Sequence, residues 1–275
     1  MSGKLIVVGT PIGNLGDLSP RAAEALGAAD FIAAEDTRVT LKLLNHLGIK
    51  KPMVSYYEHN LRERGQMIAD RILSGENCAV VSDAGMPCIS DPGEDLVRLC
   101  AAQGIAVTAV PGPSAAITAL CLSGLSTSRF RFEGFLSTNK RSRAEHLESV
   151  RSDGSTLIFY EAPHKLLNTL QDMLRVLGDR RVSIARELTK LHEEVLRVTL
   201  SEAVEHFTQN PPRGEFVLVV EGAQEQPAEE WTLDQAAALA QTFVEEGMKP
   251  SEAAKEAAKQ SGYRKSEIYS RMMEE

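Results

Sequence analysis

The chain has 275 residues, of which 43% are hydrophobic and 25% are charged, and its net charge is −8. This composition excludes a disordered or fibrous protein, and the length suits two domains with a smaller appendage. The four cysteines form no CxxC pair and lie in or beside apolar runs, so we expect neither a disulfide nor a metal site.

Short apolar runs alternate with helical patterns through the first 110 residues. The first run, at residues 5–8, is too short for a signal peptide or a membrane span, so we expect a cytoplasmic protein. Ser19 and Pro20 suit a helix start, while Gly27, Gly48 and Gly104 suit the position just past a helix end. Continuous apolar strands that alternate with helices indicate a parallel sheet covered on both faces. Strands are predicted at residues 5–8, 31–34, 52–57, 78–81 and 105–110.

A second series of strands and helices begins after residue 124. The run 194–199 follows the strand 182–185 too closely for a crossover helix, so this second sheet is expected to be mixed. The fold class is therefore α/β, with one domain at residues 1–120 and another at residues 121–223. Further strands are predicted at residues 130–135, 156–160 and 216–220, and helices near 142–150 and 163–177.

A polar stretch at residues 223–230 is typical of a linker, so a separate helical tail is expected over residues 224–275. Its last two helices would carry basic residues and resemble a helix-turn-helix. A packing or dimerisation bundle is the alternative, because the tail is acidic overall. Helices are predicted at residues 233–246, 251–261 and 265–273.

Four segments rich in glycine, proline or acidic residues follow strands of the first domain, where open parallel sheets place their ligands. Residues 9–16 match neither the dinucleotide fingerprint nor the phosphate-binding loop of nucleoside triphosphatases. Residues 82–93 hold two aspartates, two glycines and two prolines, which predicts a pre-shaped loop that meets a ligand with its backbone. Within this loop, Ser90 or Asp91 is also placed to cap the helix expected at 93–103.

The other two segments each allow two interpretations. At residues 35–38, Glu35 and Asp36 would face a cation or a hydroxyl group of a ligand, or Asp36 would cap a helix. Residues 110–116 enter a helix with small side chains, which suits close packing of an adenine or similar ring, or helix capping alone.

Charge is uneven along the chain. Residues 129–190 carry 12 basic and 8 acidic side chains, whereas the segments on either side are net acidic. This middle segment therefore predicts a surface for a polyanion, or else a solvated basic face.

Together these segments resemble the tetrapyrrole methylase superfamily over about residues 4–222. Within it they are most similar to the members that methylate small-subunit ribosomal RNA. The resemblance is carried by Gly9-Thr10-Pro11-Ile12-Gly13-Asn14-Leu15, Glu35-Asp36-Thr37-Arg38, the loop 82–93, Pro111-Gly112-Pro113-Ser114-Ala115, Tyr160-Glu161-Ala162-Pro163-His164 and Arg186-Glu187-Leu188-Thr189-Lys190.

The resemblance implies an enzyme that uses S-adenosylmethionine to methylate the ribose 2′-oxygen of a cytidine in the decoding region of small-subunit ribosomal RNA. Its substrate would be the free RNA or the assembled 30S subunit. The resemblance also implies two α/β domains with the cofactor in the cleft between them, and a homodimer. The implied cofactor contacts fall on Pro11, Asp83, Met86, Pro87, Ile89, Ser90, Ser114, Ala115 and Ala162.

The residues themselves agree with this chemistry. A positive sulfonium suits a backbone-lined site that holds a carboxylate such as Asp83 or Asp36. A ribose hydroxyl must also lose its proton to a positioned base, and spacing does not choose among the candidates. The candidate bases are Glu187, Lys190, Glu161 and Asp36. Contacts to RNA phosphates are expected from Arg38, Lys140, Arg141 and Arg143.

Two other functions stay open at this point. A methylase of this kind could take a tetrapyrrole or another small molecule, although the basic segment and the tail disfavour that substrate. A protein that has lost catalysis could instead bind nucleic acid through its tail, although the motifs in its ligand-binding loops are intact, which counts against this function.

Overall fold

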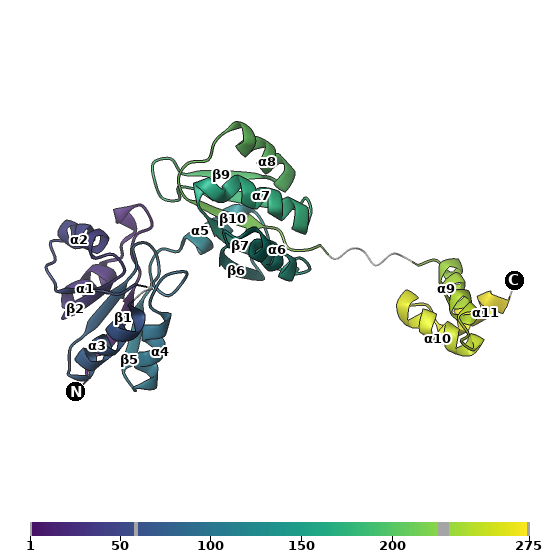
Figure 1. Ribbon diagram of the computed structural model, residues 1–275, viewed down its shortest axis with the longest axis horizontal. Coiled ribbons are helices and arrows are strands. Elements are labelled where there is room, and N and C mark those ends of the chain that lie inside the picture. The colour runs from purple at the N-terminus through teal and green to yellow at the C-terminus, as the bar shows by residue number, and fades with distance from the viewer. Residues whose placement is uncertain (1, 58–59, 225–230, 274–275) are drawn as a thin grey trace. The chain divides into compact units, whose positions relative to one another are not determined.

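The computed structural model of the protein describes residues 2–57, 60–224 and 231–273 (Figure 1). The chain forms two compact units, Met1–Ala223 and Gln224–Glu275. Within the described residues, the first unit contains two five-stranded sheets and the second contains three helices. The predicted α/β fold followed by a helical tail is therefore confirmed. We call residues 2–114 the first half of the larger unit and residues 115–223 its second half.

The first sheet is built from five parallel strands, namely β1 (Lys4–Val8), β2 (Phe31–Ala34), β3 (Met53–Ser55), β4 (Cys78–Val81) and β5 (Ala106–Val110). Their order in the sheet is β3-β2-β4-β1-β5. The helices around it are α1 (Pro20–Ala28), α2 (Thr37–His46), α3 (Leu61–Leu73) and α4 (Glu94–Ala102), with a 3₁₀ turn η1 (Leu15–Asp17). α3 and α4 cover one face and α1 and α2 the other, so the predicted doubly covered parallel sheet is confirmed.

The predicted helix ends are confirmed with one exception. Ser19 caps α1 by accepting a backbone amide, and Gly48 and Gly104 follow α2 and α4 with positive φ values. The prediction for Gly27 is wrong, because α1 continues through it. Ala29, just after the helix, is buried in the same core as Leu26, so the apolar packing of this segment extends past Gly27.

The second sheet is mixed, as predicted from the short spacing of two of its strands. Its strands are β6 (Phe130–Phe135), β7 (Thr156–Glu161), β8 (Arg181–Arg186), β9 (Glu194–Thr199) and β10 (Phe216–Val220). In the order β6-β7-β10-β8-β9, β10 runs antiparallel to both of its neighbours and is buried along its whole length. The helices α6 (Lys140–Ser149), α7 (Pro163–Leu177) and α8 (Leu200–Gln209) supply the apolar core of one face.

Helix α5 (Ala115–Ser123) follows the first sheet in sequence but packs against the second. Ala116, Ala119 and Leu120 are buried against apolar residues of β7, β8 and β10. The boundary predicted at residues 120–121 thus falls inside this helix, and the chain changes from one sheet to the other ahead of it. The sequence of α5 is apolar all round, so no polar face marks where the second half begins.

The second unit consists of α9 (Leu233–Glu245), α10 (Pro250–Ser261) and α11 (Lys265–Met273), close to the helices predicted from sequence. Its small core is formed largely by alanines, joined by Ile268 and Met272. The predicted linker lies mostly outside the described residues. Among the helices that the structure does describe, none is long and apolar enough to span a membrane.

Candidate active site

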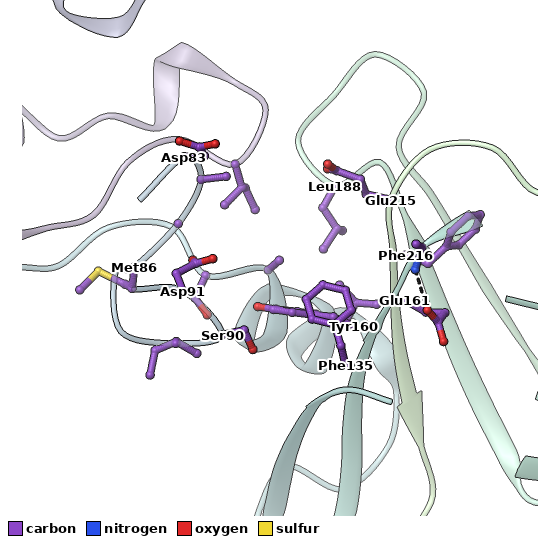
Figure 2. Close-up of a pocket in the computed structure, with 18 of the residues that line it drawn as sticks. Asp83, Met86, Ser90, Asp91, Phe135, Tyr160, Glu161, Leu188, Glu215 and Phe216 are labelled. Atoms are coloured by element: carbon purple, nitrogen blue, oxygen red, sulfur yellow. Dashed lines mark hydrogen bonds between the residues drawn. The ribbon is translucent and has the colours of Figure 1, made fainter. Parts of the chain in front are cut away.

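A cavity of about 500 Å³ lies between the strand ends of the first sheet and the second half (Figure 2). An open parallel sheet predicts a site at this edge, and the volume is typical of sites for small molecules. The first half lines it with Ile12, Glu35, Asp83, Ala84, Gly85, Met86, Ile89, Ser90, Asp91 and Ser114. The second half lines it with Ala115, Phe135, Tyr160, Glu161, Ala162, Pro163, Ala185, Leu188, Glu215, Phe216 and Val217.

The cavity brings together most of the residues for which the sequence predicts a cofactor contact. Pro11 and Pro87 are not among its lining residues, but each is the chain neighbour of one, Ile12 and Met86 respectively. The predicted contact residues that line the cavity are Asp83, Met86, Ile89, Ser90, Ser114, Ala115 and Ala162.

The loop at residues 82–93 forms one wall and is held in an unusual backbone conformation. Gly85 exchanges two backbone hydrogen bonds with Thr10 at the end of β1, of 2.8 and 3.1 Å. Cys88 and Ser90 have φ values of 75° and 62°, in a region that side chains rarely occupy. Neither Ser90 nor Asp91 caps α4, so that prediction is wrong. Gly93 occupies the cap position instead, and Asp91 is left at the cavity wall.

Three carboxyl groups of the first half, those of Glu35, Asp83 and Asp91, face the cavity. The ends of β2 and β4 are tied together, because Asp83 accepts a hydrogen bond from the Asp36 amide at 3.1 Å and donates its own amide to Glu35 at 3.3 Å. Burial is the main cause that raises the pKa of all three groups, and repulsion from neighbouring carboxylates, among them Asp36, adds to the effect. The pKa of Asp91 rises to about 6. A wall of crowded, desolvated carboxyl groups favours a cationic ligand.

Asp36, predicted as a cofactor contact or a base, is not among the residues that line the cavity. It caps α2 by accepting the Arg38 amide at 2.8 Å, which bears out the capping interpretation. Its carboxylate also pairs with the Arg38 guanidinium at 2.6 Å, and these hydrogen bonds lower the pKa of Asp36 to about 2. Arg38 itself remains 88% exposed at this edge of the sheet.

The opposite wall presents the amino-terminal ends of two helices. Ser114 and Ala115 begin α5, and Ala162 and Pro163 begin α7. The Tyr160 hydroxyl accepts the backbone amide of the first turn of α5 at 3.2 Å. Helix amino-termini carry partial positive charge, so this wall favours an anionic group. The two walls therefore differ in electrostatic character.

Glu161 lines the cavity, but its buried carboxylate is turned to neighbours. It accepts hydrogen bonds from the Thr169 hydroxyl at 2.5 Å and from the Ala162 amide at 2.9 Å. Lys165 lies 3.9 Å away. This side chain therefore fixes the start of α7, and its lone pairs are largely used.

Glu187 and Lys190, the remaining candidate bases, form a bridge at the edge of the cavity. The Lys190 ammonium donates to Glu187 at 2.9 Å and to the lining residue Glu215 at 2.8 Å. Burial lowers the pKa of Lys190, but these hydrogen bonds outweigh burial and leave the pKa above its usual value. Lys190 thus holds its proton. Glu187 and Thr189 adopt φ values of 50° and 66°, so this loop is strained like the loop across the cavity.

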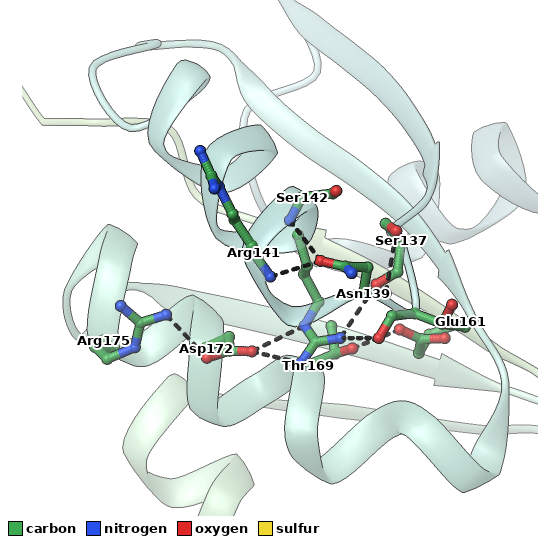
Figure 3. A network of polar contacts seen from close by, with 10 residues as sticks. Ser137, Asn139, Arg141, Ser142, Glu161, Thr169, Asp172 and Arg175 are labelled. Carbon is green, nitrogen blue, oxygen red and sulfur yellow. Dashed lines mark hydrogen bonds and ion pairs between the residues drawn. The ribbon is translucent and has the colours of Figure 1, made fainter.

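Arg143 does not face solvent, which contradicts the RNA contact predicted for it. Its guanidinium pairs with Asp172 at 2.7 Å and donates to the carbonyls of Ser137 and Thr138 at 3.1 and 3.3 Å (Figure 3). Arg143 lies four residues before the buried Leu147 on the same face of α6, and this spacing was the available signal. Lys140 and Arg141, in contrast, are exposed at the start of the helix.

Several lining residues were not among the predicted site residues. Glu35 and Asp91 stand inside segments that the sequence marks, where Glu35 is expected near a ligand cation or hydroxyl group without a named role and Asp91 is expected to cap a helix. Glu215 follows Gly214, and this glycine is the local signal of a turn in the sequence. In the structure Gly214 has a φ of 91°. Phe135 belongs to a strand and gives no signal of its own, whereas Tyr160 stands in a segment that carries the family resemblance but has no contact assigned to it there. Among the described residues, no cluster of His, Cys, Asp and Glu could hold a metal ion, and the four cysteines are free.

The fold matches solved structures of other enzymes. Over 82% of this chain and 92% of the other, it aligns with diphthine synthase at a TM-score of 0.63 and 17% identity. Over 79% of this chain and 94% of the other, it aligns with uroporphyrin-III-C-methyltransferase from Thermus thermophilus at a TM-score of 0.56 and 17% identity. At such identities these likenesses concern the fold alone.

Sequence comparison is more specific. The family model of Tetrapyrrole (Corrin/Porphyrin) Methylases matches residues 4–204. A Synechocystis protein named "Ribosomal RNA small subunit methyltransferase I" is 45% identical over 273 residues, which are 99% of this chain and 98% of that protein. A Thermotoga maritima protein of the same name is 49% identical over 222 residues, which are 81% of this chain and all of that protein. The chain therefore belongs to the tetrapyrrole methylase family, in the branch of the proteins named ribosomal RNA small subunit methyltransferase I.

Proposed function

We propose that this protein uses S-adenosylmethionine to methylate the ribose 2′-oxygen of a cytidine in the decoding region of small-subunit ribosomal RNA. The observation that carries this proposal is the 45% identity over 99% of the chain to a protein named for methylation of this RNA. The proposal includes a cytoplasmic homodimer, since the RNA substrate is found there and the family resemblance implies the dimer.

The cavity suits the proposed cofactor. S-adenosylmethionine supplies an electrophilic methyl group on a positive sulfonium, and its amino-acid part carries an ammonium and a carboxylate. The acidic wall of Glu35, Asp83 and Asp91 would attract the cationic groups. The amino-termini of α5 and α7 would attract the carboxylate. A ligand with charges of both signs thus fits the two walls better than a simple cation or anion.

The residues around the cavity must also orient the ribose hydroxyl and accept its proton. Each of the four predicted bases is engaged elsewhere: Asp36 with Arg38, Glu161 with Thr169, and Glu187 and Lys190 with each other. Asp91 lines the cavity, and its pKa of about 6 lies near neutral pH, where a general base is most effective. We therefore assign the proton acceptor to Asp91.

A labelling experiment tests the function directly. The purified protein is incubated with tritiated S-adenosylmethionine and, in separate reactions, with small ribosomal subunits, naked small-subunit RNA and a porphyrin precursor. We expect label in the RNA of the first or second reaction, and mass spectrometry of nuclease digests should place the methyl group on a cytidine ribose. Label only in the porphyrin would support a small-molecule methylase, and label in no reaction would overturn both enzyme functions.

A further inference from the structure

Phe135 is a large aromatic residue at the wall of the cavity, yet 54% of its surface is exposed. It is the last residue of β6 and comes from the second half (Figure 2). Aromatic side chains contribute most when they are covered, so a half-exposed ring that faces a cavity leaves area for a ligand to cover.

An irregularity in β6 turns Phe135 toward the cavity. The register with β7 shifts between Phe132 and Gly134, so that Phe132 pairs with Ile158 and Phe135 with Tyr160. Ile158 and Tyr160 are two residues apart and share one face of the sheet. Phe132 and Phe135 therefore lie on that same face although they are three residues apart. In a regular strand Phe135 would point to the opposite face, where α6, α7 and α8 pack.

The ring is held in a fixed position. It meets the ring of Tyr160 edge to face, with centroids 5.5 Å apart, and Phe132 meets the same tyrosine at 5.0 Å. Gly134 has a φ of 64°, and a Cβ atom there would lie 3.2 Å from the Ser90 hydroxyl of the opposite half. The bulge therefore lies close to the loop at residues 82–93, and the contact with Tyr160 places the ring of Phe135 at the cavity.

The surroundings of Phe135 suit a nucleotide. Two cations, Lys140 and Arg141, follow it by five and six residues and are exposed. The chain between them is anchored by Arg143, which donates hydrogen bonds to the carbonyls of Ser137 and Thr138. An extended chain of this length spans at most about 20 Å, so the two cations lie within about 20 Å of the aromatic face. Proteins that bind unpaired nucleotides combine these two elements.

We propose that Phe135 is the stacking platform for the base of the nucleotide whose ribose is methylated, with Lys140 and Arg141 on the adjoining phosphates. This inference rests on the proposed function. A phenyl ring has no hydrogen-bonding group, so the platform supplies affinity and position and does not select the base. The base must leave its helix to reach the ring, as in other enzymes that act on a nucleotide inside a folded nucleic acid.

The test compares Phe135→Leu with Phe135→Trp. Leucine keeps an apolar side chain but has no flat face, whereas tryptophan keeps a flat face. We expect Phe135→Leu to lower kcat/KM for small ribosomal subunits by at least about tenfold, the typical loss when one stacked base loses its partner. Phe135→Trp should retain most of the activity. The matched control is Phe130→Leu, which alters another exposed phenylalanine on the same strand that is not among the cavity-lining residues.

Calorimetric titration with S-adenosylhomocysteine separates the two bases that could stack on this ring. The affinity should be the same in wild type and in Phe135→Leu. A matching loss of affinity would place the adenine of the cofactor on Phe135 and overturn the proposal, as would unchanged kcat/KM in Phe135→Leu. If the wild-type protein labels no RNA, the proposed function itself fails, and that outcome is visible before any variant is made.

Discussion

The two halves of the larger unit treat buried charge in opposite ways. In the first half, Glu35, Asp83 and Asp91 crowd together, and their pKa values rise. In the second half, buried charges are matched, as in the pair of Arg143 with Asp172. Matched charges hold the fold together, whereas unmatched charges are costly to the folded protein and are retained where a ligand compensates them. The comparison predicts that substitutions in the two halves have different consequences.

The largest effect is expected from the matched charges. Arg143→Ala leaves the buried Asp172 with the more exposed Arg175 in place of two partners, and it frees the carbonyls of the chain that leads to α6. We expect the free energy of unfolding to fall by about 3 kcal/mol or more. Urea unfolding followed by circular dichroism measures this loss. A loss below about 1 kcal/mol would contradict a structural role for this pair.

A smaller effect, confined to binding, is expected from the unmatched charges. Asp83→Asn retains an oxygen that can accept the Asp36 amide but removes the charge. We expect the affinity for S-adenosylmethionine to fall roughly tenfold, since a hydrogen bond to a charged group is worth about 1.5 kcal/mol or more. The thermal stability of the free protein should be unchanged or higher. Calorimetric titration measures the affinity and a melting curve measures the stability. Lower stability with unchanged affinity would show that Asp83 stabilises the fold and does not serve binding.

The pH dependence of binding tests the same wall without a change in the fold. The pKa of Asp91 is about 6 in the folded protein, above its ordinary value of 3.8, so the carboxyl takes up a proton as the pH falls through 6. Cofactor affinity should therefore decrease between pH 7 and pH 5, while the stability contribution of this group to the free protein improves over the same range.

Asp91→Asn is the variant that isolates this titration. Its cofactor affinity should vary less between pH 7 and pH 5 than that of the wild type. Glu205→Gln, which alters an exposed carboxylate on α8, is the control and should keep the wild-type profile. An identical profile in Asp91→Asn and the wild type would assign the titration to another group.

The smallest effect is expected on the exposed basic side chains. The double substitution of Lys140 and Arg141 by alanine should weaken binding to small ribosomal subunits roughly fivefold at moderate salt. It should also reduce the slope of log affinity against log salt concentration by an amount that corresponds to about two phosphate contacts. Stability should not change, because Arg143 is left in place. The control is the double substitution of Lys4 and Lys50 by alanine. Both lysines are exposed near the amino-terminal ends of strands of the first sheet, away from the ends that line the cavity. Equal losses in both double variants would indicate general charge effects.

The sequence predicted the site far better in the first half than in the second. Parallel strands place their following loops at one edge, so the segments after β1, β2, β4 and β5 could be assembled without coordinates. In the second half the decisive feature is a shift in strand register. Phe135 reads as an ordinary strand residue until its pairing with β7 is known. Non-local pairing of this kind has no signature in the local sequence.

The assignment of charged residues failed for a related reason. Arg143 stands in a cluster with Lys140 and Arg141, and the sequence alone predicts one basic surface for all three. A helix turns by about 100° per residue, so neighbours in sequence face different ways, and Arg143 falls on the buried face. Composition located the basic segment, but only the orientation of α6 showed which of its cations can reach a partner.

The strand order has a consequence for how the chain folds while it is being synthesised on the ribosome. The centre of the second sheet is β10, the last strand to be synthesised, and it separates β7 from β8. Until residue 220 has left the exit tunnel, the sheet can exist only as two strand pairs, β6 with β7 and β8 with β9, each with an open apolar edge. The first sheet needs the chain only to residue 110. The first sheet and the acidic wall at its edge can therefore form early in synthesis, whereas the second sheet is completed only after almost the whole unit has been made.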